Sequence, residues 1–246
     1  MSTAISLSKS AKQTKLPRFS VSSSLKVLAG PYAETFYINK ELICAASKFF
    51  ETMCEDSPQD GHRRTITLID IDAEAFAIFS IWLTTGNLSI SSVPLSIEAE
   101  LESAEKHFAL WQQLGCCYNL GDRLLRPRFK NAIMDALVNL SKILVMDYNT
   151  FPIQTAEELE IVYKTTKPGS ELRMLIVDLT IGCLGLKSLE GLDRGQPHLD
   201  AFCMEVLGRT YDLLSDHQGG GWREGCYLEY PWECLGTRYH GLEEEA

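Results

Sequence analysis

The alternation of hydrophobic and polar residues near the N-terminus predicts a β-hairpin. Apolar residues occupy every second position in residues 25–29 and again in residues 35–38, which is the period of a strand with one buried face. The residues between these runs include Gly30 and Pro31, which are typical of a turn. We therefore expect two antiparallel strands joined by a short loop.

Two short helices are expected directly after the hairpin. Asn39 can cap a helix that begins at Lys40, because its side chain can accept a hydrogen bond from a backbone N–H of the first turn. Apolar residues then recur at helical spacing through residues 42–53. Ser47 interrupts this run and can act as a second N-cap, which divides the segment into two helices.

A polar loop, a third strand and a capped helix follow. Residues 55–64 contain proline and glycine and predict a loop, whereas residues 65–70 alternate as a strand does. Asp72 is placed to cap the next helix, and Gly86 is placed to end it in the left-handed conformation. The apolar stripe of that helix is Phe76, Phe79 and Leu83.

The remainder of the chain has a helical period after a Ser-rich linker. A helix is expected to begin in the acidic residues 98–106 and to continue to about residue 124, and Pro127 fits the first position of another. Thr155 and Glu158 form a capping box for the next helix. Further helices are expected from Leu172, ending at Gly182 and Gly185, and from Pro197.

Composition describes an ordinary soluble globular protein with a sizeable core. Of 246 residues, 45% are hydrophobic and 23% are charged, and the net charge of −10 argues against a general nucleic-acid binder. No apolar run is long enough to span a bilayer, and no secretory segment is visible. The acid-free start could act as a mitochondrial transit peptide, but its low hydrophobicity favours a disordered tail.

The eight cysteines indicate a reduced, intracellular protein, because their density is too low for a disulfide scaffold. Adjacent Cys116 and Cys117 are expected to pack in the core rather than to react. Six cysteines fall in apolar helical patterns, where a thiol behaves as a small hydrophobe: Cys44, Cys54, Cys116, Cys117, Cys183 and Cys203.

No pattern of catalytic residues is present, so we expect neither an enzyme nor a cofactor. The chain lacks a phosphate-binding glycine loop and a Gly-x-Ser-x-Gly elbow. The one candidate metal site consists of Cys226, Cys234 and His240, although zinc sites usually have shorter, paired spacings. The histidines are expected at surface or loop positions: His62, His107, His198, His217 and His240.

The order of these motifs resembles a BTB/POZ domain of the type common in fungal proteins. The matching residues are Val27–Gly30, Phe36–Leu42, Ser47–Phe50, Leu68–Phe76 and Trp82–Gly86. A C-terminal pattern typical of the fungal proteins is also present, with Ile161–Thr166 followed by Ser170, Leu172 and Arg173.

The resemblance implies an α+β fold, with a small β-sheet clustered with α-helices and followed by a mainly α-helical C-terminal region. It divides the chain into a basic Ser/Lys-rich tail, the BTB/POZ-like domain, a helical extension, and a tail of glycine, aromatic and acidic residues. These parts correspond to residues 1–23, 24–142, 143–216 and 217–246.

The resemblance also implies a non-catalytic protein–protein interaction module, an adaptor or scaffold whose partners are other proteins. Cullin-recruiting members of the family carry a hydrophobic-x-Glu motif where this chain has Pro58-Gln59-Asp60, and most members have His where this chain has Asn39. A cullin-type ubiquitin-ligase substrate adaptor is therefore a second hypothesis. The candidate contact residues are Phe50, Met53, Pro58, Gln59, Asp60 and Tyr118.

Two more functional classes fit the sequence. The chain could be a transcriptional or chromatin regulator that acts through partners, or a metal-binding protein that uses the tail. BTB self-association is a further candidate interaction, although the low apolar content of the N-terminal tail favours a monomer or weak dimer. No direct contact with nucleic acid or membrane is expected, and the expected location is the nucleus or the cytoplasm.

Overall fold

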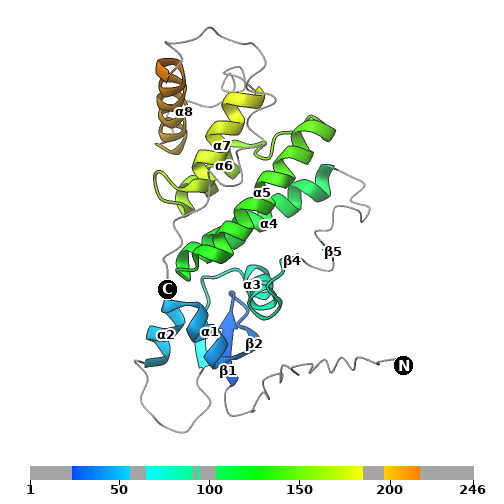
Figure 1. Ribbon diagram of the computed structural model, residues 1–246, viewed down its shortest axis with the longest axis vertical. Helices are drawn as coiled ribbons and strands as arrows, with labels where there is room; N and C mark the ends of the chain where they lie inside the picture. The colour runs from blue at the N-terminus through cyan, green and yellow to red at the C-terminus, as the bar shows by residue number, and fades with distance from the viewer. Residues whose placement is uncertain (1–23, 56–64, 91–92, 95–103, 185–196, 217–246) are drawn as a thin grey trace, which may run out of the picture.

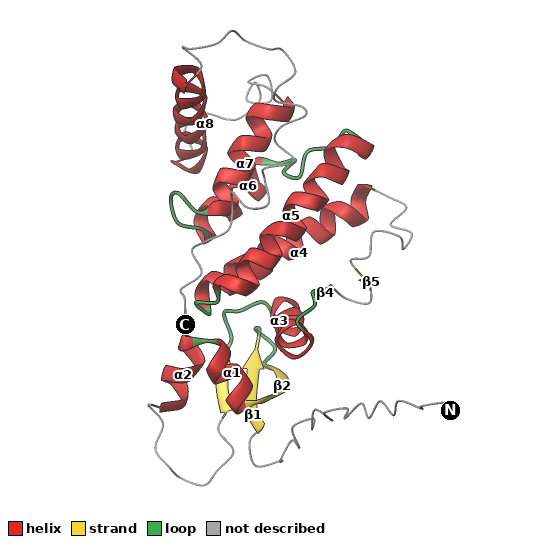
Figure 2. Ribbon diagram, in the orientation of Figure 1, coloured by secondary structure: helices red, strands yellow, loops and turns green. Residues whose placement is uncertain are grey.

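The computed structural model describes residues 24–55, 65–90, 93–94, 104–184 and 197–216. The described elements form an elongated molecule (Figure 1). A small sheet and the first helices lie at one end, a long helical hairpin crosses the middle, and the last helices lie at the other end. Figure 2 shows that the three-stranded sheet is confined to the first of these ends.

The sheet is built around its first strand, in the order β2-β1-β3. Strand β1 (Ser24–Ala29) pairs antiparallel with β2 (Glu34–Asn39) and parallel with β3 (Thr65–Leu68). Val27 on the buried face therefore has Phe36 and Ile66 as its neighbours on the two sides. The predicted hairpin is confirmed, and the parallel pairing of β3 was not predicted.

Helices α1 (Lys40–Ala46) and α2 (Lys48–Glu55) follow the hairpin as expected, with Asn39 as the cap of the first. The Asn39 Oδ1 accepts a hydrogen bond from the Leu42 N–H at 2.9 Å. Ser47 does divide the two helices, but the expectation that its side chain caps the second is wrong. Its buried hydroxyl instead donates to the carbonyl oxygen of Leu124 at 2.7 Å, because that distant carbonyl lies within reach.

Helix α3 (Ala73–Thr85) begins and ends where its sequence signals predict. The Asp72 Oδ1 accepts from the Ala75 N–H at 2.7 Å, and Gly86 has a φ of 74°. Gly30 is also required, because its φ is 77° and a Cβ at this position would lie 3.0 Å from the Cβ of Ala73. The hairpin turn therefore packs directly on the start of α3. Two short strands, β4 (Ser89–Ile90) and β5 (Val93–Pro94), pair after this helix.

Helices α4 (Ala104–Arg123) and α5 (Pro127–Tyr148) form the hairpin in the middle of the molecule. The described part of α4 begins at Ala104, and residues 98–103 lie outside the description. Pro127 occupies the first turn of α5 as predicted. The boundary expected after residue 142 falls inside α5, so the chain has no break in secondary structure there.

Three further α-helices follow within the described residues: α6 (Ala156–Thr165), α7 (Glu171–Leu179) and α8 (Pro197–Asp216). The capping box of Thr155 and Glu158 is confirmed, with both reciprocal hydrogen bonds present. Gly182 does not end α7 as expected, because the chain continues into a π-helical turn, Thr180–Leu184, that contains this glycine. Gly185 lies outside the described residues.

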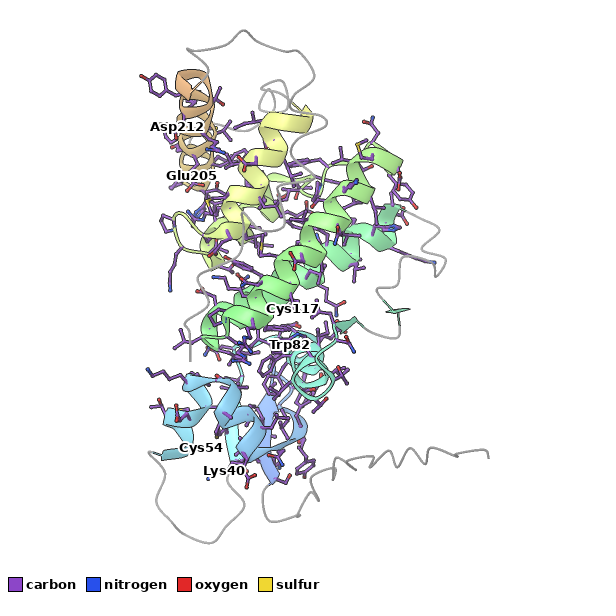
Figure 3. The ribbon with its side chains drawn as sticks, in the orientation of Figure 1. Lys40, Cys54, Trp82, Cys117, Glu205 and Asp212 are labelled. Atoms are coloured by element: carbon purple, nitrogen blue, oxygen red, sulfur yellow. The ribbon has the colours of Figure 1, made fainter. Side chains whose placement is uncertain are left out.

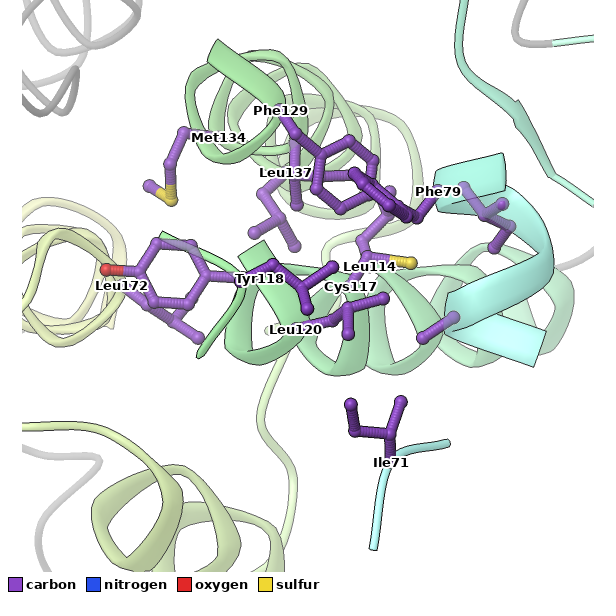
Figure 4. Close-up of a cluster of buried hydrophobic side chains, with 14 of the residues drawn as sticks. Ile71, Phe79, Leu114, Cys117, Tyr118, Leu120, Phe129, Met134, Leu137 and Leu172 are labelled. Atoms are coloured by element: carbon purple, nitrogen blue, oxygen red, sulfur yellow. The ribbon is translucent and has the colours of Figure 1, made fainter. Parts of the chain in front are cut away.

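One continuous hydrophobic core joins the sheet to the helical region. Phe129 of α5 faces Phe79 of α3, and Tyr118 of α4 lies beside Leu172 of α7 (Figure 4). The hairpin thus contributes side chains to both ends of the molecule. The expected fold class is confirmed: a small sheet with helices, followed by a mainly helical region. Among the helices described, none is both long and apolar enough to span a bilayer.

Candidate functional site

The structure separates the candidate contact residues into three groups. Phe50 is fully buried and Tyr118 is 1% exposed, so both lie in the core. Met53, near the end of α2, is 40% exposed. Pro58, Gln59 and Asp60 lie outside the described residues. Of the six candidates, Met53 is thus the described one whose side chain a partner could reach.

The outer face of α2 includes a residue that the sequence interpretation missed. Phe49 is only partly buried, whereas its neighbour Phe50 is fully buried, and the two rings meet edge to face at 5.2 Å. Phe49 precedes Met53 by four positions and shares its face of the helix. That four-residue spacing could have indicated from the sequence that Phe49 shares the exposed face with Met53. However, two adjacent phenylalanines do not show by themselves which ring faces the core.

The edge strand β2 presents a second exposed surface. Tyr37 is 63% exposed on this strand, and Tyr32 in the preceding turn is 88% exposed. Since β1 occupies the centre of the described sheet, the outer edge of β2 has no strand partner among the described residues. An edge strand of this kind can pair with another chain. The alternation of Tyr37 with buried Ile38 was the sequence signal for its outward position.

Helix α8 has two apolar faces. Leu199, Phe202 and Val206 are buried against α6 and α7. A second set on the other face is exposed, with Met204 at 68%, Leu207 at 54% and Tyr211 at 71%. Their spacing of three and four residues places them on one stripe. We call Met204, Leu207 and Tyr211 the α8 stripe, and it lies at the end of the molecule away from the sheet (Figure 1).

One buried arginine links α8 to α6 and α7. Arg173 of α7 donates to the carbonyl oxygens of Tyr163 and Thr166 and to the Thr166 hydroxyl, and it pairs with Glu205 of α8 at 3.4 Å. Its guanidinium carbon lies 4.2 Å from the centre of the Tyr163 ring. Figure 3 places Glu205 on α8, near the other two helices. Arg173 thus joins three helices.

The Tyr163 hydroxyl completes this arrangement. It donates to the second carboxylate oxygen of Glu205 at 2.6 Å. Burial, followed by this hydrogen bond to a carboxylate, raises the pKa of Tyr163 above its ordinary value. The phenol therefore stays protonated across the physiological range and remains a hydrogen-bond donor to α8.

A cluster of charged residues lines a pocket of about 220 Å³ between α4, α5 and the α6–α7 loop. Lys130 pairs with Asp122 at 3.0 Å and with Glu171 at 3.1 Å, and the Tyr118 hydroxyl also donates to Glu171. Lys167 pairs with Asp122 at 3.5 Å. The charges of this cluster therefore neutralise one another, and the arrangement holds three helices together.

The pKa values in this cluster favour the paired, charged forms. Burial opposes ionisation of Glu171, but hydrogen bonds from Tyr118 and Lys130 outweigh it and lower the pKa of Glu171. Burial likewise opposes the charge on Lys130, yet its hydrogen bond to Asp122 and its other contacts raise the pKa of Lys130. Burial and the bond to Glu171 raise the pKa of Tyr118 to about 12.

The lowered pKa of Glu171 predicts a loss of stability in acid. The folded chain binds fewer protons at this carboxyl than the unfolded chain. At pH values above the ordinary pKa of 4.5, the ionised Glu171 side chain therefore makes its full contribution to folding stability. This contribution is lost as the pH falls through the lower folded value. We expect the urea midpoint to fall less between about pH 6 and about pH 3 in Glu171→Gln than in the unaltered chain. The exposed variant Glu157→Gln is the control, and identical pH profiles for both variants would contradict this prediction.

The described residues contain no group of three His, Cys, Asp or Glu side chains that could hold a metal ion. Cys226, Cys234 and His240 lie outside the description. The expectation that histidines occupy surface or loop positions is wrong for His107, which is 5% exposed within α4. Its ring lies 5.1 Å from the ring of Tyr148, because the α4–α5 hairpin brings the two helices together.

The two adjacent cysteines differ in their surroundings. Cys117 is fully buried, as the expected core packing requires, whereas Cys116 is exposed. Burial raises the pKa of both thiols, and nearby Asp72 and Glu74 raise that of Cys116 further. Neither thiol therefore has the lowered pKa of a reactive nucleophile.

The comparisons with known proteins agree with this architecture. Residues 24–117 match the family model described as the BTB/POZ domain. No curated protein matches the chain. The matched segment spans the sheet, the first three helices and more than half of α4. A BTB/POZ domain is thus detected at residues 24–117, and domains of this family are modules through which proteins bind partners or copies of themselves.

Proposed function

We propose that this protein is a non-catalytic adaptor that binds one protein partner at each end. The observation that carries this proposal is the placement of exposed apolar side chains at both ends. Tyr32, Tyr37 and Met53 lie at the end with the sheet, and the α8 stripe lies at the other. Exposed aromatic and methionine side chains are typical of protein-binding surfaces.

The interior of the described chain supports an interaction role rather than catalysis. The charged side chains in the pocket pair with one another, and the thiols of Cys116 and Cys117 have raised pKa values. Catalytic groups usually have pKa values near the operating pH. The polar residues here instead join helices, which is what a rigid scaffold between two partners requires.

Affinity purification with quantitative mass spectrometry tests the two-ended arrangement. We expect the double variant Met204→Glu with Leu207→Glu to lose one set of partners, and Tyr37→Glu with Met53→Glu to lose a different set. Met146→Glu is the matched control, because Met146 is a 58% exposed methionine of α5 outside both surfaces. If both double variants lose the same partners, or neither loses any, the adaptor proposal fails.

A cullin-type ubiquitin-ligase scaffold is the first specific partner that we propose for the sheet end. Met53 supports this, because it is exposed in the last turn of α2, five positions before Pro58 in the chain. A pull-down with purified cullin scaffold at micromolar concentration tests it. Binding that Met53→Glu weakens would support the assignment, and no binding by the unaltered chain would exclude it.

Self-association through the BTB domain is the second proposal, favoured by the exposed edge of β2. Sedimentation at low micromolar concentration distinguishes the monomer of 27.6 kDa from a dimer of twice that mass. The sequence favours a monomer or weak dimer. A stable dimer that Tyr37→Glu disrupts would show that the edge strand forms the contact.

The remaining proposals concern the cellular location of the protein, a regulatory role, a metal site and the type of BTB protein. We propose an intracellular location, nuclear or cytoplasmic, and nuclear enrichment of a tagged chain would favour a partner-dependent transcriptional or chromatin regulator. Stoichiometric zinc in the purified protein would instead favour a metal site in the tail. We also propose that the chain belongs to the fungal type of BTB protein, a proposal that rests on the C-terminal sequence pattern of Ile161–Thr166 followed by Ser170, Leu172 and Arg173.

A further inference from the structure

Two cysteine sulfur atoms lie close together between the short helices α1 and α2. The Cys44 Sγ is 3.1 Å from the Cys54 Sγ and 3.7 Å from the carbonyl oxygen of Phe50. Cys44 is partly exposed, and Cys54 is 7% exposed. Of this pair, solvent therefore reaches Cys44 more readily.

The surrounding fold holds both helices in place. Buried Ser47 joins the helix junction to Leu124, the residue directly after α4, and fully buried Phe50 anchors α2 in the core. The two thiols therefore meet because of tertiary packing and not only because they are ten positions apart. A disulfide needs an S–S separation of about 2.05 Å, so the sulfur atoms have to approach by only about 1 Å.

We propose that Cys44 and Cys54 form a reversible intramolecular disulfide by exchange with a low-molecular-weight disulfide. The Cys44 thiolate attacks one sulfur of the reagent, forms a mixed disulfide and releases one thiolate of the reagent. The Cys54 sulfur then attacks the Cys44 sulfur, forms the protein disulfide and releases the second thiolate. The two cysteines lose two protons and two electrons, and the reagent is reduced to two thiols.

The environment of the pair determines how fast this exchange proceeds. Burial, followed by the hydrogen bond with Cys54, raises the pKa of Cys44 to about 12. The thiolate fraction at neutral pH is therefore small, and exchange is slow. Disulfides in reducing compartments are usually transient and regulatory. Such a bridge would tie the end of α2, next to Met53, to α1.

Tryptic mapping of the full chain after incubation with oxidised glutathione tests the proposal. Cleavage after Lys40, Lys48 and Arg63 places the two cysteines in separate peptides that contain no other cysteine. We expect these peptides, residues 41–48 and 49–63, to be recovered as one cross-linked species. Its mass is lower than the sum of the reduced peptides by two hydrogen atoms, and reductant separates it.

Three variants make the result decisive. Cys54→Ser is expected to accumulate glutathione on Cys44, because the second step is blocked, and Cys44→Ser is expected to remain unmodified at Cys54. Cys203→Ser, which alters a partly buried cysteine of α8, should form the bridge as the unaltered chain does. Glutathione that persists on Cys44 in the unaltered chain, or cross-linking of Cys44 to another cysteine, would overturn the proposal. Full recovery of both peptides in reduced form would do so too.

Discussion

Replacing Phe129 with alanine is expected to lower the free energy of unfolding by about 3–5 kcal/mol. Phe129 is fully buried, and its ring lies 5.2 Å from Phe79 and 5.1 Å from Trp82 of α3. The variant would lose these contacts and leave a cavity where α5 meets α3. Urea unfolding followed by far-ultraviolet circular dichroism measures the change, with the exposed Met146→Ala as the control. Equal unfolding midpoints for the two variants would contradict the prediction.

The same contact predicts that the family-matched segment does not fold alone. A fragment of residues 24–117 ends within α4 and lacks all of α5. It leaves Phe79 and Trp82 without Phe129, whose loss costs a large part of a typical total stability of about 5–15 kcal/mol. We expect that fragment to unfold without cooperativity and a fragment of residues 24–149 to retain a cooperative transition. A sharp transition in the shorter fragment would show that the sheet end is self-sufficient.

Arg173→Met is expected to destabilise the chain by about 3 kcal/mol, at the lower end of the range for breaking a buried ion pair. The lower value applies because the Glu205 side chain is 30% exposed and can be hydrated. The variant leaves the carbonyl oxygens of Tyr163 and Thr166 without their guanidinium donor. Amide hydrogen exchange is expected to show the greatest loss of protection in α8.

Two control variants separate the geometry of Arg173 from its charge. Arg173→Lys keeps the charge but cannot reach all the acceptors at once, so we expect it to recover little of the lost stability. Lys164→Met removes an exposed ion pair with Glu160 and should leave the urea midpoint nearly unchanged, because exposed ion pairs contribute little to stability. Full stability in Arg173→Lys would show that charge alone matters and would contradict the proposed role of the guanidinium geometry.

Local signals in the sequence predicted the fold well because they act within a few residues. The caps at Asn39 and Asp72, the capping box at Thr155 and the left-handed glycine at Gly86 each depend on one turn of helix. Contacts between distant residues were not predictable in this way. The hydrogen bond from Ser47 to Leu124 spans 77 positions, and nothing in the local pattern around Ser47 indicates it.

The candidate surface was harder to predict because a periodic pattern does not reveal which apolar face is covered. Phe50 was one of the six predicted contact residues, and the structure leaves its neighbour Phe49 more accessible. Helix α8 poses the same difficulty, because Val206 is buried while Leu207 is 54% exposed. Only the packing of α8 on α6 and α7 decides between its two faces.

The hairpin of α4 and α5 has a thermodynamic consequence for any partner. Since its side chains complete the core on the sheet side and on the α7 side, unfolding of either end removes packing from the other. A partner that binds only the folded chain stabilises it in proportion to the logarithm of its concentration over its Kd. A partner bound at the sheet end would therefore raise the melting temperature of α8 as well. Each partner would stabilise the folded surface that the other one binds, without any conformational change in the chain.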